Sequence, residues 1–183
     1  MKNRLRETWR SGKPALNGWL GIPSTFSAEI MSKQDFDSIT IDLQHGLTDY
    51  SIAVPMMQAM SASDATMLCR VPWLEAGIIM KLLDAGAMGI ICPMINSRKE
   101  AEEFVGATLY SPVGYRSSGP VRANIIYPDY HNQANDQIIS MAMIETEEAV
   151  TNAEEICATP GLTGIYVGPS DLAISMGEGP GLD

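Results

Sequence analysis

Six short apolar segments alternate with longer helical patterns, and this alternation constrains the fold more than any other feature of the chain. The segments are rich in β-branched and other apolar residues, and each is expected to form a strand: Leu16–Ile22, Phe36–Leu43, Ala65–Val71, Gly89–Ile95, Ile138–Glu145 and Leu162–Val167. Because the runs are largely apolar rather than alternately apolar and polar, both faces of each strand are expected to be covered. The pattern therefore predicts a parallel sheet with helices packed against it.

The segments between the strands carry helical patterns. Helices are expected at Met1–Arg10, Ser27–Lys33, Tyr50–Ser61, Glu75–Ala85, from Asn96 or Ser97 to about Leu109, and at Glu147–Ala158. Gly86 stands where a helix is expected to stop, and Asn96 or Ser97 is a candidate N-cap. The segment from Ser111 to about Tyr130 is rich in Gly, Ser, Pro and Tyr and is expected to be a loop.

Six βα units in 183 residues allow two arrangements. A closed TIM-type (β/α)8 barrel has eight units and needs about 250 residues. The chain is therefore either an open six-stranded α/β sheet or a barrel truncated after about six units, with 177–183 as a terminal loop. In either case residues 1–183 form a single domain, since no linker, repeat or low-complexity tract divides them.

Composition and charge exclude several classes of function. The formal net charge of −10 repels nucleic acids and anionic membranes, so neither is an expected partner. No apolar run approaches the roughly 18 residues of a membrane span, and the polar Met1–Gly12 does not resemble a signal peptide. Cys69, Cys92 and Cys157 lie in apolar runs without pair spacing, which predicts reduced, buried thiols in a soluble cytoplasmic protein.

Polar residues gather where the predicted strands end. In parallel α/β folds the carboxyl ends of the strands meet at one rim, where the chemistry takes place. The residues expected at this rim are Asp42 and His45 after the second strand, Arg70 on the third, Glu145 after the fifth, and Gly168, Pro169, Ser170 and Asp171 after the sixth. Their convergence is the main functional signal in the residues themselves.

Glu145 and Asp171 are candidate metal ligands. Two carboxylates on adjacent strand ends suit a hard divalent cation such as Mg²⁺, whose other positions are filled by water and substrate oxygens. The alternative is that each carboxylate caps the helix that follows it.

His45 is a candidate general base. Its imidazole titrates near neutral pH, Gly46 indicates a tight turn, and Asp42 is placed to orient the ring. The alternative is a His–Asp pair that only holds the loop. The other histidine, His131, lies in a polar segment and is expected to be solvated.

Two arginines are candidates for binding an anionic substrate. Arg70 ends a buried strand, where it either pairs with Asp42 or a glutamate or receives a substrate carboxylate. Arg116, with Ser117 and Ser118, either covers an anionic substrate or belongs to a plain surface loop.

Six blocks of the sequence resemble one known family, in order and over nearly the whole chain. They are FDSITIDLQHG (36–46), RVPW (70–73), LLDAGAMGIICPMI (82–95), YSPVGYRSSGP (110–120), MIETEEAVTNAEEI (143–156) and GIYVGPSDLAISMG (164–177). The chain resembles the class II pyruvate aldolases, typified by 4-hydroxy-2-oxoheptanedioate and 2-dehydro-3-deoxyglucarate aldolases. These belong to the phosphoenolpyruvate/pyruvate barrel superfamily, alongside citrate lyase β-like proteins. The resemblance favours the truncated barrel.

The resemblance implies a role for each rim residue. Glu145 and Asp171 match the family's metal ligands, for Mg²⁺, Mn²⁺ or Co²⁺. His45 matches the catalytic base and Asp42 its acidic partner, and Arg70 matches the arginine that stabilises the pyruvate enolate. Gln44 stands where the family often has Glu.

The implied activity is cleavage of a 4-hydroxy-2-oxo acid to pyruvate and an aldehyde by a homo-oligomeric lyase, with the substrate against Arg70 and the turn of Gly168, Pro169 and Ser170. Two alternatives are a citrate lyase β-like enzyme acting on an acyl-CoA ester, and an inactive truncated barrel that only associates with other subunits.

Overall fold

All six expected strands are present, and they form one parallel sheet in chain order. The computed structural model describes residues 1–179, so 180–183 of the expected terminal loop lie outside the described residues. The strands are β1 (Asn17–Leu20), β2 (Ser38–Asp42), β3 (Thr66–Arg70), β4 (Gly89–Cys92), β5 (Ile139–Ile144) and β6 (Gly164–Val167). Each lies inside its expected range and is shorter than it, because the sequence pattern continues into the turns.

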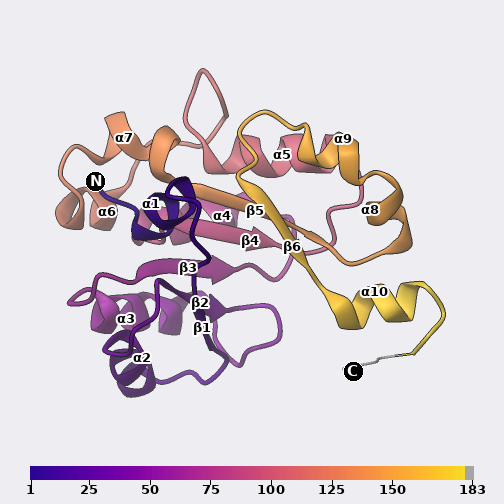
Figure 1. Cartoon of the computed structure of the whole chain (residues 1–183). Coiled ribbons are helices and arrows are strands. Elements are labelled where there is room, and N and C mark those ends of the chain that lie inside the picture. The colour runs from indigo at the N-terminus through magenta and orange to yellow at the C-terminus, as the bar shows by residue number, and fades with distance from the viewer. Residues whose placement is uncertain (180–183) are drawn as a thin grey trace.

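The sheet curls into a half-barrel, with β1 and β6 as its two edges (Figure 1). The rings of Trp19 on β1 and Tyr166 on β6 lie 5.8 Å apart between centroids, so the two edges face each other across the interior. A doubly wound sheet reverses its strand order at a switch point, whereas here the order follows the chain from β1 to β6. The barrel-type fold expected from the sequence is therefore confirmed.

The expected helices are present and most begin at a side-chain cap. They are α1 (Arg4–Arg10), α2 (Thr25–Ser32), α3 (Tyr50–Met60), α4 (Ala76–Asp84), α5 (Arg98–Thr108), α8 (Glu147–Thr151) and α9 (Ala153–Cys157). Ser97 is the N-cap of α5 and forms a capping box with Glu100. Gly86 follows α4 with a φ of +108°, a left-handed conformation that suits glycine at a helix end.

Three helices were not predicted. The segment expected to be a loop contains α6 (Val121–Ile126), and α7 (Tyr130–Gln137) follows it; α10 (Pro169–Ser175) follows β6. These short helices form through contacts distant in sequence: Arg122 of α6, for example, donates to the carbonyl of Ala85 and to Ser61 Oγ. The single helix expected at 147–158 is instead divided at Asn152, whose side chain donates to the carbonyl of Asn96 at 2.8 Å.

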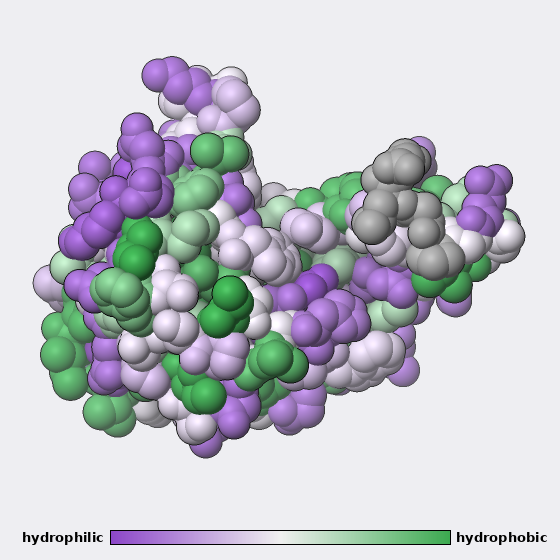
Figure 2. All heavy atoms as spheres, turned by 90° about the horizontal axis from the view of Figure 1, so that it is seen from below, coloured by the Kyte–Doolittle hydropathy of each residue, from purple (hydrophilic) through white to green (hydrophobic). Residues whose placement is uncertain are grey.

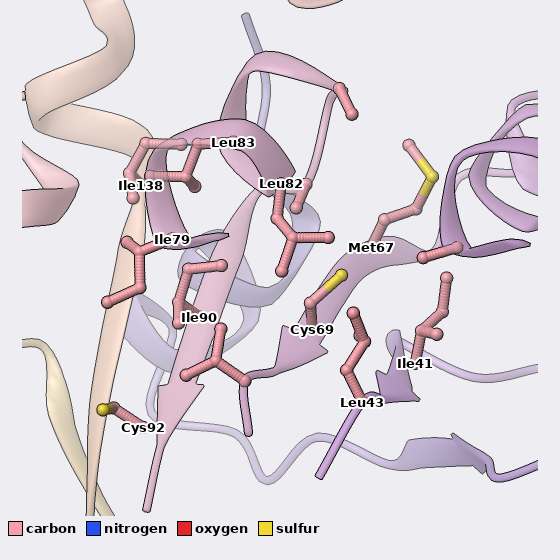
Figure 3. Close-up of a cluster of buried hydrophobic side chains, with 14 of the residues drawn as sticks. Ile41, Leu43, Met67, Cys69, Ile79, Leu82, Leu83, Ile90, Cys92 and Ile138 are labelled. Atoms are coloured by element: carbon pink, nitrogen blue, oxygen red, sulfur yellow. The ribbon is translucent and has the colours of Figure 1, made fainter. Parts of the chain in front are cut away.

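The core lies between the convex face of the sheet and the helices. Side chains from β2, β3 and β4 meet those of α4 in a cluster that includes Ile41, Cys69, Ile90, Ile79 and Leu82 (Figure 3). The outward face of β6 and the helix after it are less covered: Val167 is 54% exposed and α10 buries none of its residues. In Figure 1 this helix stands apart from the others.

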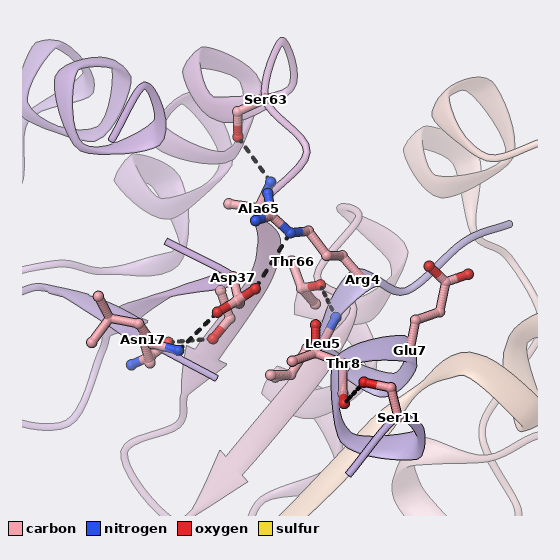
Figure 4. Close-up of polar contacts among 12 residues, drawn as sticks. Arg4, Leu5, Glu7, Thr8, Ser11, Asn17, Asp37, Ser63, Ala65 and Thr66 are labelled. Atoms are coloured by element: carbon pink, nitrogen blue, oxygen red, sulfur yellow. Dashed lines mark hydrogen bonds and ion pairs between the residues drawn. The ribbon is translucent and has the colours of Figure 1, made fainter. Parts of the chain in front are cut away.

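Helix α1 closes the amino end of the half-barrel. Leu5 forms a small inner cluster with Leu68 and Ile139, and its backbone N–H donates to Thr66 Oγ1 at 3.1 Å. Arg4 pairs with Asp37 at 3.4 Å (Figure 4). A cleft of about 590 Å³ opens beside α1 at this end of the strands, away from their carboxyl ends.

One expectation about the cysteines is corrected. Cys69 and Cys92 are buried, and burial raises the pKa of the Cys69 thiol to about 12. Cys157 is exposed, because it ends α9 at the surface.

Among the described residues, no helix is long and apolar enough to cross a membrane.

Replacing Leu82 by alanine tests the packing of α4. Leu82 is fully buried, so Leu82→Ala should lower the free energy of unfolding by about 2–5 kcal/mol through lost apolar burial and the cavity left behind. Leu16 is 61% exposed, so Leu16→Ala serves as the matched control and should change stability by no more than about 0.5 kcal/mol. Urea denaturation measures both, and equal effects would contradict the packing described.

Candidate active site

Asp42 and Arg70 form the central contact of the rim. They are register partners at the ends of β2 and β3. Arg70 donates Nε to Asp42 Oδ1 at 2.8 Å and Nη2 to Oδ2 at 2.6 Å, and the two side chains are 12% and 5% exposed. Among residues 1–179 no acceptor is paired with Arg70 Nη1. The pair expected as one alternative is therefore present, and it leaves one guanidinium nitrogen for a substrate oxygen.

The electrostatic setting keeps Asp42 ionised. Burial by itself raises the pKa of this carboxyl, but the hydrogen bond and charge of Arg70 outweigh burial and lower the pKa below its ordinary value. Asp42 Oδ1 also accepts backbone N–H groups from Gln44 at 3.0 Å and His45 at 3.3 Å. Asp42 thus contacts His45 through the main chain, and the expected contact with the imidazole ring is not among the described hydrogen bonds.

Trp19 is a site residue that the sequence reasoning missed. Its indole N–H donates to Asp42 Oδ2 at 3.4 Å, and the Arg70 guanidinium lies 4.9 Å from the centre of its ring. An aromatic ring in this position stabilises the cation through its quadrupole. Alternate residues of a strand point to the same face of the sheet, so the sequence could indicate that Trp19 on β1 faces inward. That signal does not by itself distinguish a site residue from a core residue.

His45 lies exposed on a tight loop at the same rim. A Cβ on Gly46 would approach the carbonyl oxygen of Asp42 to 2.3 Å and the Cα of Gly21 to 3.1 Å, so only glycine fits there. The loop is further fixed by Leu47, whose N–H donates to the carbonyl of Gly21 at 3.1 Å. The short loop holds the main chain of His45 against Asp42 and leaves the residue accessible to solvent.

Glu145 is buried at the end of β5, with 1% of its surface exposed. Its Oε1 accepts the backbone N–H of Met94 at 2.7 Å, and Met94 adopts a left-handed φ of +53°. A Cβ on Gly168 would come within 2.4 Å of Glu145 Oε2, so this glycine leaves room for the carboxylate. Met94 was not predicted as a site residue, because a main-chain donor carries no side-chain signal.

The pKa of Glu145 depends on the charges of the other candidate residues. Burial raises the pKa of Glu145, and the neighbouring carboxylate of Asp171 raises it further, whereas Arg70 and His45 act in the opposite direction. The structure thus brings four predicted residues, Glu145, Asp171, Arg70 and His45, within electrostatic range of one another.

Neither carboxylate is the N-cap of the helix that follows it, although Asp171 lies in the first turn of α10, where a negative charge is favourable. Thr146, not Glu145, is the N-cap of α8 and accepts the N–H of Ala149. Asp171 lies in the first turn of α10, whose N-cap residue is Gly168. Pro169 and Ser170 lie in the same first turn, so the turn expected to contact substrate is at the rim.

The two carboxylates fit a divalent cation of the Mg²⁺ class. Such an ion takes one or two protein carboxylates and completes its shell with water and substrate oxygens. In the described part of the chain no group of three or more His, Cys, Asp and Glu side chains is arranged to hold a metal, and Glu145 and Asp171 would supply two ligands. Glu145 Oε1 accepts the N–H of Met94, and among residues 1–179 no donor is paired with Oε2, which leaves that oxygen for such an ion.

Arg116 does not belong to this site, which corrects one expectation. Its side chain is fully buried and pairs with Asp84 at 2.6 Å, at the end of α4 away from the rim. It also donates to Tyr130 Oη at 2.9 Å and lies over the Tyr110 ring. It is neither a substrate contact nor part of a solvated loop. Ser117 and Ser118 are exposed beside it, as is His131, whose ring packs against Tyr110 in a tilted arrangement with the centroids 4.6 Å apart.

Comparisons with known proteins identify the family of the chain. Residues 18–180 match the HpcH/HpaI aldolase/citrate lyase family. The chain is 43% identical to a hydroxypyruvate/pyruvate aldolase of Rhizorhabdus wittichii, over 99% of this chain and 72% of that protein. It is 34% identical to a 4-hydroxy-2-oxo-heptane-1,7-dioate aldolase of Salmonella paratyphi C, over 97% and 69%.

A solved structure of a member of the same family has the same fold. The crystal structure of an HpcH/HpaI aldolase/citrate lyase family protein from Burkholderia cenocepacia superimposes with a TM-score of 0.91 at 29% identity, over 98% of this chain and 74% of that one. The curled six-stranded arrangement is therefore the arrangement of this family.

Removing the charge of Arg70 should destabilise the fold at neutral pH. Arg70→Met leaves the Asp42 carboxylate buried without its partner, which typically costs about 3–5 kcal/mol. In the wild-type protein the pKa of Asp42 is lower in the folded than in the unfolded chain, where an aspartate has a pKa of about 3.9. The ion pair therefore stabilises the fold at pH values above about 3.9, and this stability is lost as the pH falls through the folded-state pKa. In the variant, burial raises the pKa of Asp42, so protonation relieves the unpaired charge.

The difference in unfolding free energy between the two proteins should therefore narrow as the pH falls from 7 towards about 4. Urea denaturation at several pH values measures it. The control is Arg98→Met, which removes an exposed arginine paired with Glu102 and should cost less than about 1 kcal/mol. A pH-independent difference would contradict the role given to Asp42.

Proposed function

Since the chain belongs to the HpcH/HpaI aldolase/citrate lyase family, we propose that it is a metal-dependent carbon–carbon lyase that cleaves a 4-hydroxy-2-oxo acid to pyruvate and an aldehyde. The observation that carries the proposal is the buried Glu145 at the end of β5, which has Asp171, Arg70 and His45 within electrostatic range at the same rim. Carboxylates for a cation, an arginine and an accessible imidazole are the groups that enolate chemistry requires.

Glu145 and Asp171 are the residues that would hold a divalent cation. When bound there, it supplies Lewis-acid stabilisation of the negative charge on the pyruvate enolate. Arg70 donates through Nη1 to the 2-oxo acid, while its other two nitrogens stay on Asp42. Asp42 and Trp19 are positioning residues for Arg70, because both contact its guanidinium or its partner.

His45 moves the proton. In the cleavage direction the imidazole accepts the proton of the C4 hydroxyl, the C3–C4 bond breaks, and its electron pair becomes the enolate of pyruvate. The imidazolium of His45 then gives its proton to C3 of the enolate, which forms pyruvate and restores the neutral ring, and the aldehyde leaves. The exposure of His45 fits this role, because the ring must reach both substrate and solvent.

The rival activity on an acyl-CoA ester is less well supported. Such an ester carries several phosphates, for which a net charge of −10 and a rim with carboxylates are unfavourable. The identity of the metal among Mg²⁺, Mn²⁺ and Co²⁺, the homo-oligomeric state and the cytoplasmic location stay predictions. The inactive-barrel alternative is tested by the first experiment below.

Exchange of the pyruvate methyl protons with deuterium tests enolate formation without any aldehyde. Wild-type protein with Mn²⁺ should exchange them and should also release pyruvate from a 4-hydroxy-2-oxo acid. His45→Ala should slow pyruvate release by about 10²- to 10⁴-fold, the usual contribution of a general base. The control is His131→Ala, which alters an exposed histidine outside the rim. Metal-independent exchange, or none in the wild type, would refute the proposal.

Metal binding has a readout that does not depend on turnover. Glu145→Gln and Asp171→Asn should each weaken Mn²⁺ binding by at least about tenfold in calorimetry, because each removes one anionic ligand. Glu147→Gln is the control, since Glu147 is exposed in the first turn of α8 and lies two residues from Glu145. Unchanged affinity in the first two variants would remove these residues from the proposed metal site.

A further inference from the structure

The rim of the half-barrel has two chemically different sides. The side formed after β5 and β6 carries the carboxylates Glu145 and Asp171. The opposite side is formed by the loops after β1, β2 and β3, residues 21–24, 43–49 and 71–75, which we call the apolar rim. These loops lie together at the carboxyl ends of their strands (Figure 1), and the hydrogen bond from Leu47 to Gly21 joins the first two.

Large apolar side chains of the apolar rim are exposed to solvent. Ile22 is 66% exposed, Leu47 82% and Trp73 58%. Leu47 follows His45 by two residues, and Trp73 follows Arg70 by three, so the exposed groups flank the two candidate reacting residues. Figure 2 views the molecule from the side on which α2 and α3 lie in Figure 1, and apolar residues are exposed there among polar ones.

Apart from His45, which the C4 hydroxyl occupies in the proposed reaction, the apolar rim offers no cationic side chain to an anion. Its three loops contain no lysine and no arginine. Backbone N–H groups at the start of α3 and α4, which follow two of these loops, already have acceptors. Asp49 accepts the N–H of Ile52, and Glu75 accepts those of Gly77 and Ile78. A carboxylate placed against these apolar side chains would lose part of its hydration without gaining a lysine or arginine partner, which is unfavourable.

The position of the aldehyde part of the substrate follows from the proposed function, on which this inference rests. The 2-oxo acid end needs Arg70 and the carboxylate side of the rim. The C4 hydroxyl must reach His45, so the C4 carbon lies next to the loop that carries His45. The substituent on C4 then extends over the apolar rim. We propose that this substituent is uncharged and apolar, so that the aldehyde substrate is an aliphatic or aromatic aldehyde rather than one bearing a second carboxylate.

A pair of aldehydes of matched shape tests the proposal. In 4-methylpentanal an isopropyl group replaces the carboxylate of 4-oxobutanoate, with the same number of heavy atoms. With pyruvate and Mn²⁺ held constant, kcat/KM for addition to 4-methylpentanal should exceed that for 4-oxobutanoate by at least about tenfold. A preference for 4-oxobutanoate, or equal values, would overturn the proposal.

Leu47→Arg places a cation on the apolar rim. It should shift the ratio of the two kcat/KM values towards 4-oxobutanoate by about fivefold to tenfold, and the shift should shrink as salt is added. Leu16→Arg is the matched control, because Leu16 is similarly exposed but precedes β1 at the opposite end of the sheet. An equal shift in both variants would show a general charge effect and would also count against the proposal.

Failure of this inference is distinguishable from failure of the proposed function. Deuterium exchange into pyruvate needs no aldehyde. Exchange with a preference for 4-oxobutanoate would leave the lyase intact and refute only the apolar aldehyde, whereas absence of exchange would refute both.

Discussion

The ion pair of Asp42 and Arg70 is the interaction on which the rest of the site depends. It joins the last register pair of β2 and β3, and the same two carboxylate oxygens accept the N–H groups of Gln44 and His45 and the indole of Trp19. Burying two charges costs desolvation free energy that their attraction does not always repay. Besides the stability that the lowered pKa of Asp42 gives the fold at neutral pH, the contact therefore fixes one guanidinium and one loop.

The curvature of the sheet is the second requirement. Glu145 follows β5, three strands along from the β2 residue Asp42, and only a curled sheet brings these strand ends to face each other. Trp19 and Tyr166 make that curvature visible, since their rings meet from the two edge strands. The result is a rim with carboxylates on one side, an arginine and an imidazole on the other, and exposed apolar groups beyond them.

Much of the fold was predictable because its signals are local. The apolar runs identified all six strands, and the candidate cap at Asn96 or Ser97 marked the start of α5 to within one residue, since each depends on a few neighbouring residues. Helices α6 and α7 were missed because their segment has little helical periodicity and is stabilised by distant contacts, such as the hydrogen bonds of Arg122. Arg116 was misplaced for the same reason: its partner Asp84 lies 32 residues away.

The sequence by itself determined the order of the strands and which polar residues stand at their carboxyl ends, because parallel strands joined by helices place those ends at one edge. Only the tertiary structure decided the partners. It paired Arg70 with Asp42 across 28 residues and Glu145 with the N–H of Met94 across 51. It also brought Trp19 under the guanidinium. The physical reason is that a buried charge takes whichever partner the packed chain brings within hydrogen-bonding distance, and that distance depends on the curvature of the sheet and the path of its loops.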